Sequence, residues 1–178
     1  MSEKTEVRLF PSPEPLATPT DLSSDDVRKV TEAINPLVAD TFALYVKTKN
    51  YHWHLSGARF RDLHLFFDEQ AEEIFAFTDP MAERIRRIGG TTIRSISHIN
   101  ALQTINDDNE EFRNPDDMIR RLMEDNRHYV QLQRRAHEVC DQAGDVATAS
   151  LLEDAIDATE KRIWFLYEYL QDTDRFFD

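Results

Sequence analysis

Four long stretches of this chain carry apolar residues at every third or fourth position, and this spacing constrains the fold more than any other feature. The first stretch runs from Ser24 to about His54, and its apolar positions are Val27, Val30, Ile34, Val38, Phe42 and Tyr45. No window shows the alternation of apolar and polar residues, bounded by turns, that is typical of a strand. The chain is therefore expected to be all-α.

Capping and breaking residues set the limits of the first two helices. Ser24, followed by two aspartates, is expected to cap the first helix, and Pro36 is expected to kink it or to divide it. The second helix is expected over residues 60–88, because the glycines from Gly89 onward end its apolar period. Pro80 has no backbone N–H to donate, so it should loosen this second helix locally.

The second half of the chain holds two more helices after a long connection. The connection covers residues 91–113, and a short helix is expected within 95–105. Asn114 and Pro115 are typical of an N-cap followed by a proline in the first turn, and Asp145 is expected to cap the last helix. Two short links and one long crossover are typical of a ferritin-like four-helix bundle rather than an up-down-up-down bundle.

The length of the chain, 178 residues, is sufficient for one domain with its own core and too short for two ordinary domains. The bundle domain is expected over residues 24–171. Residues 1–23 hold four of the seven prolines and little that could be buried, so they are interpreted as an extended or disordered tail. Residues 172–178 are interpreted as a C-terminal tail.

Composition excludes several classes of protein. Lys and Arg total 21 against 34 Asp and Glu, and the net charge of −13 would repel a nucleic-acid duplex and attract cations. The single cysteine, Cys140, excludes an intrachain disulfide framework and a cysteine-rich metal site. No apolar run approaches the roughly 20 residues of a membrane span, and the N-terminus lacks the pattern of a secretion signal. A cytoplasmic protein with no membrane partner is expected.

Two pairs of potential metal ligands lie on the second predicted helix. His64 and Asp68 are four residues apart, as are Asp79 and Glu83, so each pair projects from one face of the helix. At roughly 100° per residue, the four positions lie at about 0°, 40°, 60° and 100° around the helix axis, measured from His64. All four therefore share about one quadrant, away from most of the apolar stripe.

The axial spacing of the two pairs predicts a site shared between chains. Asp68 and Asp79 are eleven residues apart, about 16 Å along a helix, so one chain cannot bring both pairs to one ion. If two such helices packed antiparallel about a two-fold axis, the first pair of one chain would lie near the second pair of its partner. His52, at the end of the first helix, could add a second imidazole. Two imidazoles with three carboxylates suit iron.

These positions resemble the ferroxidase signature of the Dps proteins, the mini-ferritins named as DNA-binding proteins from starved cells. The signature is a His, a His twelve residues later, an Asp four further on, an Asp eleven further on and a Glu four after that. This sequence has them at His52, His64, Asp68, Asp79 and Glu83. The resemblance covers about residues 25–170, and its flanking segments are KTKNYHWHLSG, FRDLHLFFDEQ, TDPMAERIR and KRIWFLYEYL.

The resemblance implies a hollow dodecamer built on two-fold dimers that oxidises Fe(II), preferentially with hydrogen peroxide rather than oxygen, and stores ferric mineral inside. Such an activity would protect DNA and the cell from oxidative damage. The resemblance also implies acidic pores near the start of the last helix, to which Asp145, Glu153 and Asp154 are assigned. Trp53 is interpreted as a packed aromatic side chain, with an electron donor beside the iron as the alternative.

Other functions remain open at this point. Relatives that bind DNA commonly use a Lys-rich N-terminal arm, whereas this arm is acidic, so direct DNA binding is not expected. The competing hypothesis is a nucleoid protein that compacts DNA, with iron chemistry secondary. A third is an inert structural bundle, for which His64→Ala would leave iron behaviour unchanged. An intrachain di-iron site would need Glu-x-x-His motifs, and the sequence has none.

Overall fold

The computed structural model describes residues 13–171, and all of the regular structure in this range is helical. The helices are η1 (Glu14–Leu16), α1 (Ser24–His54), α2 (Phe60–Phe75), α3 (Thr78–Arg87), α4 (Ile96–Leu102), α5 (Pro115–Gln142) and α6 (Val146–Tyr169). The all-α prediction is confirmed. The predictions of a tail at residues 1–12 and 172–178 lie outside the described residues.

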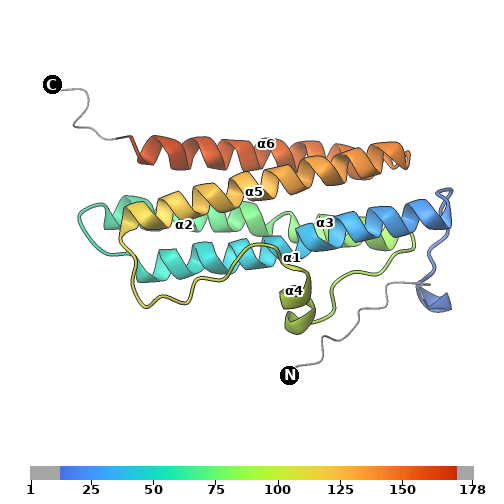
Figure 1. Cartoon of the computed structure of the whole chain (residues 1–178), viewed down its shortest axis with the longest axis horizontal. Helices are drawn as coiled ribbons and strands as arrows, with labels where there is room; N and C mark the ends of the chain where they lie inside the picture. Colours follow the sequence, from blue (N-terminus) through green and yellow to red (C-terminus); the bar gives the residue numbers. More distant parts are fainter. Residues whose placement is uncertain (1–12, 172–178) are drawn as a thin grey trace.

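Four helical rods form the bundle: α1, α2 followed by α3, α5 and α6 (Figure 1). Helix α1 packs antiparallel to α2 and α3, and α5 packs antiparallel to α6 (Figure 1). The crossover that carries α4 returns along α1 from the end of α3 to the start of α5 (Figure 1). This long crossover makes the bundle ferritin-like, as predicted. None of the helices in the described part of the chain combines the length and apolar character needed to span a bilayer.

Apolar side chains from all four rods meet on the bundle axis, as the sequence period predicts. The most deeply buried of them include Ile34, Leu44, Phe67, Ile74, Ile85, Ile119, Leu122, Leu152 and Leu166.

The helix starts follow the predicted capping residues with one correction. Asn114 and Asp145 cap α5 and α6, accepting from the backbone N–H groups of Asp117 and Thr148. The cap of α1 is Ser23, not Ser24, because the Ser23 hydroxyl accepts from Asp26 at 3.1 Å.

Pro36 was expected to kink the first helix or to divide it, and the structure excludes the division, because α1 continues through the proline. Contacts on either side of the proline support the helix there. Asn35 donates from Nδ2 to the carbonyl of Thr91 at 3.0 Å, and the Tyr129 hydroxyl donates to the carbonyl of Leu37 at 3.3 Å. These tertiary contacts offset the backbone hydrogen bond that the proline removes.

The prediction of one unbroken helix over residues 60–88 is wrong. Helix α2 ends at Phe75 and α3 begins at Thr78. Pro80 explains the position of the break, since its ring would clash with the carbonyl of Ala76, four residues earlier, and it has no N–H to donate to that carbonyl. In the first turn of a new helix, the missing N–H costs nothing.

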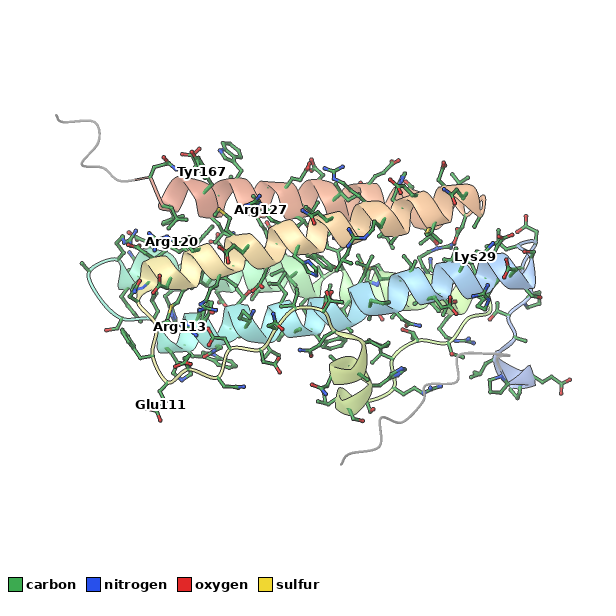
Figure 2. The ribbon with its side chains drawn as sticks, viewed as in Figure 1. Lys29, Glu111, Arg113, Arg120, Arg127 and Tyr167 are labelled. Carbon is green, nitrogen blue, oxygen red and sulfur yellow. The ribbon has the colours of Figure 1, made fainter. Side chains whose placement is uncertain are left out.

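Two aspartates, one on α1 and one on the crossover, form hydrogen bonds that hold the crossover against α1. Asp40 on α1 is fully buried and accepts from the Thr104 and Ile105 backbone N–H groups at 2.6 and 3.0 Å. Asp108 on the crossover accepts from the Tyr51 hydroxyl and from Arg113, which projects from the same connection (Figure 2).

The segment before α1 also contacts the bundle, although an extended tail was expected up to residue 23. Its backbone passes so close to Gly89 that a Cβ added there would lie 2.8 Å from the carbonyl oxygen of Thr18. Gly89 also has φ +87°, a conformation that favours glycine. Contact with the bundle thus begins before residue 24, within the range that was interpreted as a tail.

Candidate metal centre

His52 and His64 lie face to face where the end of α1 meets the first half of α2. Their rings stack with centroids 3.7 Å apart and an interplanar angle of 17°. Each ring donates from Nδ1 to the backbone carbonyl of the other residue: His52 to His64 at 2.7 Å, and His64 to His52 at 2.9 Å. The hairpin between α1 and α2 is therefore closed by the two imidazoles themselves.

This reciprocal bonding determines which ring nitrogen can bind a metal. Because a carbonyl can only accept, both Nδ1 atoms carry the proton, and in the neutral rings both Nε2 atoms keep a free lone pair. An Nδ1–H donated to a carbonyl is the usual second-shell support of a metal-bound histidine. The same contacts fix the orientation of both rings before any ion binds.

Asp68 completes a cluster on the Nε2 side of His52. Its Oδ1 lies 3.9 Å from His52 Nε2, one turn of α2 beyond His64. The same Oδ1 forms an ion pair with the ammonium group of Lys49, which lowers the pKa of Asp68 below its ordinary value. The carboxylate is thus ionised and already holds one cation.

Lys49 is the residue at this site that was not singled out from the sequence. It precedes His52 by three residues on α1, so it lies on the same helix face, and this spacing could have indicated it. Its side chain is mostly covered, with 18% exposed.

Asp79 and Glu83 lie on the separate helix α3, and both are exposed. Asp79 lines a groove of about 530 Å³ bounded by α1, the end of α2, α3 and the crossover, where its neighbours are mainly apolar, including Phe42, Phe75 and Ile96. Glu83 forms an ion pair with Arg87 one turn along α3.

The single chain does not gather all five predicted ligands. Between residues 13 and 171, no group of three or more His, Cys, Asp or Glu side chains is arranged so that it could hold a metal ion. The structure brings His52, His64 and Asp68 together, while the other two predicted ligands project outward from α3. Any centre that uses all five residues needs a second chain.

Three large apolar side chains close to the two histidines in the sequence are exposed. Trp53 is 63% exposed, so the prediction that it packs is wrong for the single chain. Phe60 and Leu65 are 44% and 49% exposed, and the Phe60 ring stacks on His64 with centroids 5.0 Å apart. Exposed aromatic and aliphatic groups around a cluster of ligands are typical of a protein interface.

The three predicted pore residues have different environments. Asp145 is only 5% exposed and is held by Arg84 Nη2 at 2.7 Å and by Thr148, so this geometry does not favour it as a pore ligand. Glu153 and Asp154 are exposed on α6.

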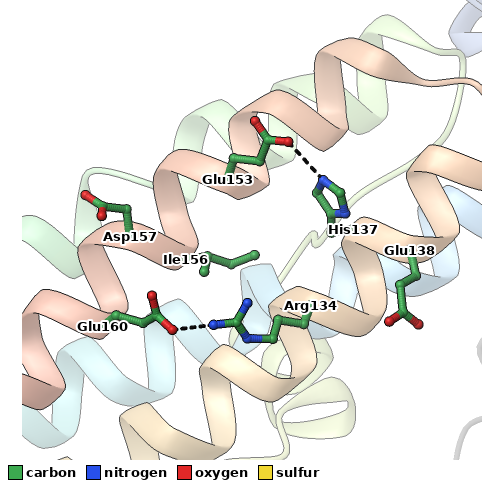
Figure 3. Close-up of a pocket in the computed structure, with 7 residues that line it drawn as sticks. All are labelled: Arg134, His137, Glu138, Glu153, Ile156, Asp157 and Glu160. Carbon is green, nitrogen blue, oxygen red and sulfur yellow. Dashed lines mark hydrogen bonds and ion pairs between the residues drawn. The ribbon is translucent and has the colours of Figure 1, made fainter.

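Glu153 lines a shallow pocket between α5 and α6, where it contacts His137 Nε2 at 3.2 Å (Figure 3). Arg134 and Glu160 form an ion pair across the same pocket (Figure 3). The only histidine in this pocket is therefore paired with a single carboxylate.

Comparison with known proteins shows the family to which the chain belongs. A model of the ferritin-like domain matches residues 31–176, which is most of the chain. The DNA protection during starvation protein 1 of Deinococcus radiodurans is 30% identical over 151 residues, covering 85% of this chain and 73% of that protein. The chain belongs to the Dps family of ferritin-like proteins.

Solved structures resemble the chain over nearly its whole length. DpsC from Streptomyces coelicolor superposes with a TM-score of 0.86 at 27% identity, covering 95% of this chain and 98% of that one. The Dps protein of Vibrio cholerae O1, described as a member of a broad superfamily of ferritin-like diiron-carboxylate proteins, gives a TM-score of 0.81 at 27% identity. That match covers 87% of this chain and 98% of the other.

Proposed function

We propose that this protein is a ferroxidase and iron store of the Dps type, which binds Fe(II) between two chains and oxidises it to Fe(III). The observation that carries the proposal is the His52–His64 pair, whose Nδ1 protons are held by backbone carbonyls so that both Nε2 atoms are available. Asp68 adds an ionised carboxylate beside one of those nitrogens. A mixed imidazole and carboxylate set suits iron in both oxidation states.

The remaining ligands come from the partner chain in this proposal. A two-fold axis between antiparallel α2–α3 rods would bring Asp79 and Glu83 of the partner to the His52–His64–Asp68 cluster, and would form two equivalent sites. The apolar surface around Trp53, Phe60 and Leu65 supports an interface at this place. Such dimers would assemble further into a hollow dodecamer that holds the ferric mineral.

The chain contributes geometry and charge, and the iron contributes the electrons. Fe(II) entering the cluster displaces the Lys49 ammonium from Asp68, so a carboxylate that was already ionised receives the metal without releasing a proton. Two ferrous ions then give one electron each to hydrogen peroxide, which with two protons yields two waters and two ferric ions. This two-electron route avoids the hydroxyl radical, and the carboxylates stabilise the added positive charge.

Several finer assignments belong to the same proposal. Peroxide would be the preferred oxidant over oxygen, Trp53 would donate electrons to stray oxidising species, and Glu153 with Asp154 would line the route by which iron enters. The site of action is the cytoplasm. DNA would be protected chemically, by removal of iron and peroxide, because a chain of net charge −13 is repelled by a duplex.

The proposal is tested by anaerobic loading with Fe(II), followed by peroxide at half the iron concentration in the presence of a radical trap. Wild-type protein should oxidise the iron rapidly without trapped radical, and a His64→Ala/Asp68→Ala variant should not. The matched control is His137→Ala/Asp141→Ala, which removes the same two kinds of side chain at the same four-residue spacing from α5 and should retain rapid oxidation. Slow, equal oxidation with trapped radical in all three proteins would refute the proposal.

A further inference from the structure

Helix α6 carries an arginine into the centre of the bundle. Arg162 is only 2% exposed, and its Nε donates to Asn126 Oδ1 at 3.0 Å while its Nη2 donates to Thr159 Oγ1 at 2.7 Å. Both acceptors are uncharged. Among residues 13–171, no carboxylate forms an ion pair with this guanidinium, and its third nitrogen, Nη1, is buried without a hydrogen-bond partner.

Gln70 on α2 faces the same place. It is 4% exposed, and neither its Oε1 nor its Nε2 has a hydrogen-bond partner within the described part of the chain. Gln70 and Arg162 both line a partly enclosed cavity of about 60 Å³ between α2 and α6. Phe66 and Phe165 form the apolar part of the lining, and Gln70 and the Nη1 of Arg162 are its buried polar groups without a partner.

Two glutamates and a lysine form the remainder of the lining. Glu73 is already engaged, since Lys161 Nζ lies 2.9 Å from its Oε1. Glu69 is exposed. The mouth of the cavity therefore carries acidic charge, while the charge at its buried end is the guanidinium alone.

A buried guanidinium without a counter-ion is costly. Burial lowers the pKa of Arg162 to about 10, so the side chain is still cationic at neutral pH. Removing such a charge from water costs several kcal/mol unless an anion or a full set of hydrogen bonds replaces the solvent. In these two residues of the lining, Arg162 Nη1 and Gln70 Nε2 are donors without a partner, and Gln70 Oε1 is an acceptor without one.

We infer that the cavity between α2 and α6 binds one small monovalent inorganic anion, such as chloride or bicarbonate, against Arg162 and Gln70. An anion supplies the missing counter-charge and accepts from both unpartnered donors. The cavity exceeds what one water needs, about 10–15 Å³, yet is too small for an organic acid. The glutamates in the lining disfavour a dianion.

This anion site is separate from the proposed iron site. Gln70 follows Asp68 by two residues on α2, so the two side chains point in directions about 200° apart around the helix. One face of α2 is therefore directed toward the interface ligands and the other toward α6. Loss of iron binding and loss of anion binding can be measured independently.

The direct test is diffraction from crystals of the whole protein grown with sodium bromide. An anomalous bromide peak in hydrogen-bond contact with Arg162 Nη1 is expected. In solution, the thermal unfolding midpoint should be higher in sodium chloride or bicarbonate than in sodium gluconate of equal ionic strength, because gluconate is too large to enter. A concentration tenfold above the dissociation constant should raise the midpoint by about 3–6 °C. The more stabilising salt identifies the preferred anion.

Variants locate the effect. Gln70→Glu places a carboxylate beside the guanidinium, so it should raise the midpoint in gluconate and remove the response to chloride and bicarbonate. His64→Ala/Asp68→Ala should keep the full response. Equal midpoints in all three salts for the wild type, with no bromide peak at Arg162, would show that the cavity holds water only and would overturn the inference.

Discussion

Asp40→Ala is expected to release the crossover from α1. The Asp40 carboxylate accepts from the backbone N–H groups of Thr104 and Ile105 at 2.6 and 3.0 Å, and from the Thr104 hydroxyl at 2.7 Å. Alanine would leave both backbone N–H groups without this acceptor, while the Thr104 hydroxyl could still donate to His128 Nε2 at 2.8 Å. A buried unsatisfied donor costs about 1–3 kcal/mol. Thr104 is exposed and can bind water instead, whereas Ile105 is buried. The free energy needed to open the crossover away from α1 is therefore expected to fall by about 2–4 kcal/mol in total.

Asp40→Asn is the matched comparison, because its side-chain oxygen can still accept from both N–H groups. The Thr104 hydroxyl, which lies 2.8 Å from His128 Nε2, could then accept from the new amide and donate to the imidazole. All the hydrogen bonds can still form, with donor and acceptor exchanged only between residue 40 and the Thr104 hydroxyl. The free energy needed to open the crossover is therefore expected to fall by only about 1 kcal/mol.

Hydrogen exchange of the crossover amides measures the loss of local stability in each of the two variants. Protection at Ile105 should fall by about 30- to 900-fold in Asp40→Ala and by about fivefold in Asp40→Asn. Asp107→Ala, a change at an exposed aspartate in the same crossover, should leave this amide protected. Unchanged protection in Asp40→Ala would refute the reasoning.

Three further predictions concern titratable groups. Lys49→Gln should tighten anaerobic Fe(II) binding by up to about fivefold in calorimetry, since the ammonium competes for Asp68; weaker binding would show that Lys49 positions the carboxylate instead. Hydrogen bonds hold the pKa of Asp108 well below its ordinary value, so the stability it contributes is present above about pH 4 and is lost as the pH falls through its folded-state pKa. Asp108→Asn should therefore flatten the acid unfolding curve below pH 4, as followed by circular dichroism, and an unchanged slope would contradict this. Burial raises the pKa of Cys140 to about 12, so iodoacetamide at pH 8 should label it at least about a hundredfold more slowly in native than in urea-unfolded protein; comparable rates would contradict that burial.

Local sequence signals predicted most of the fold. The caps at Asn114 and Asp145 depend on side chains that bond to a backbone N–H three residues away, so position in the sequence is sufficient to find them. The break before α3 is also local in origin, since Pro80 interferes with Ala76. Only a local loosening was predicted there and not a break, because the apolar period continues across residues 76 and 77 without interruption.

Tertiary contacts determined the features that were not predicted. Pro36 stays inside α1 because Asn35 and Leu37 are bonded to segments far away in the sequence. A charged residue such as Arg162 is ordinarily assigned to a helix surface, and only packing shows that it is buried.

Some features of the candidate site could likewise be predicted from the sequence, and others depend on tertiary contacts. The four-residue spacing predicted that His64 and Asp68 share one helix face, and the position of His52 at the end of the preceding helix indicated that it could join them. The choice of Nδ1 as the donor on both rings could not be predicted, because it depends on carbonyls brought close by the hairpin itself.

The central claim is that each iron site combines residues from two chains, and subunit mixing tests it most directly. A His64→Ala/Asp68→Ala chain and an Asp79→Ala/Glu83→Ala chain should each lack tight Fe(II) binding when assembled alone. Co-assembled in equal amounts, half of the dimers are mixed, and each mixed dimer has one intact site, so about a quarter of the wild-type sites should return. Anaerobic Fe(II) titration that finds this recovery would support the account. A co-assembled protein that binds no more iron than either variant alone would contradict it.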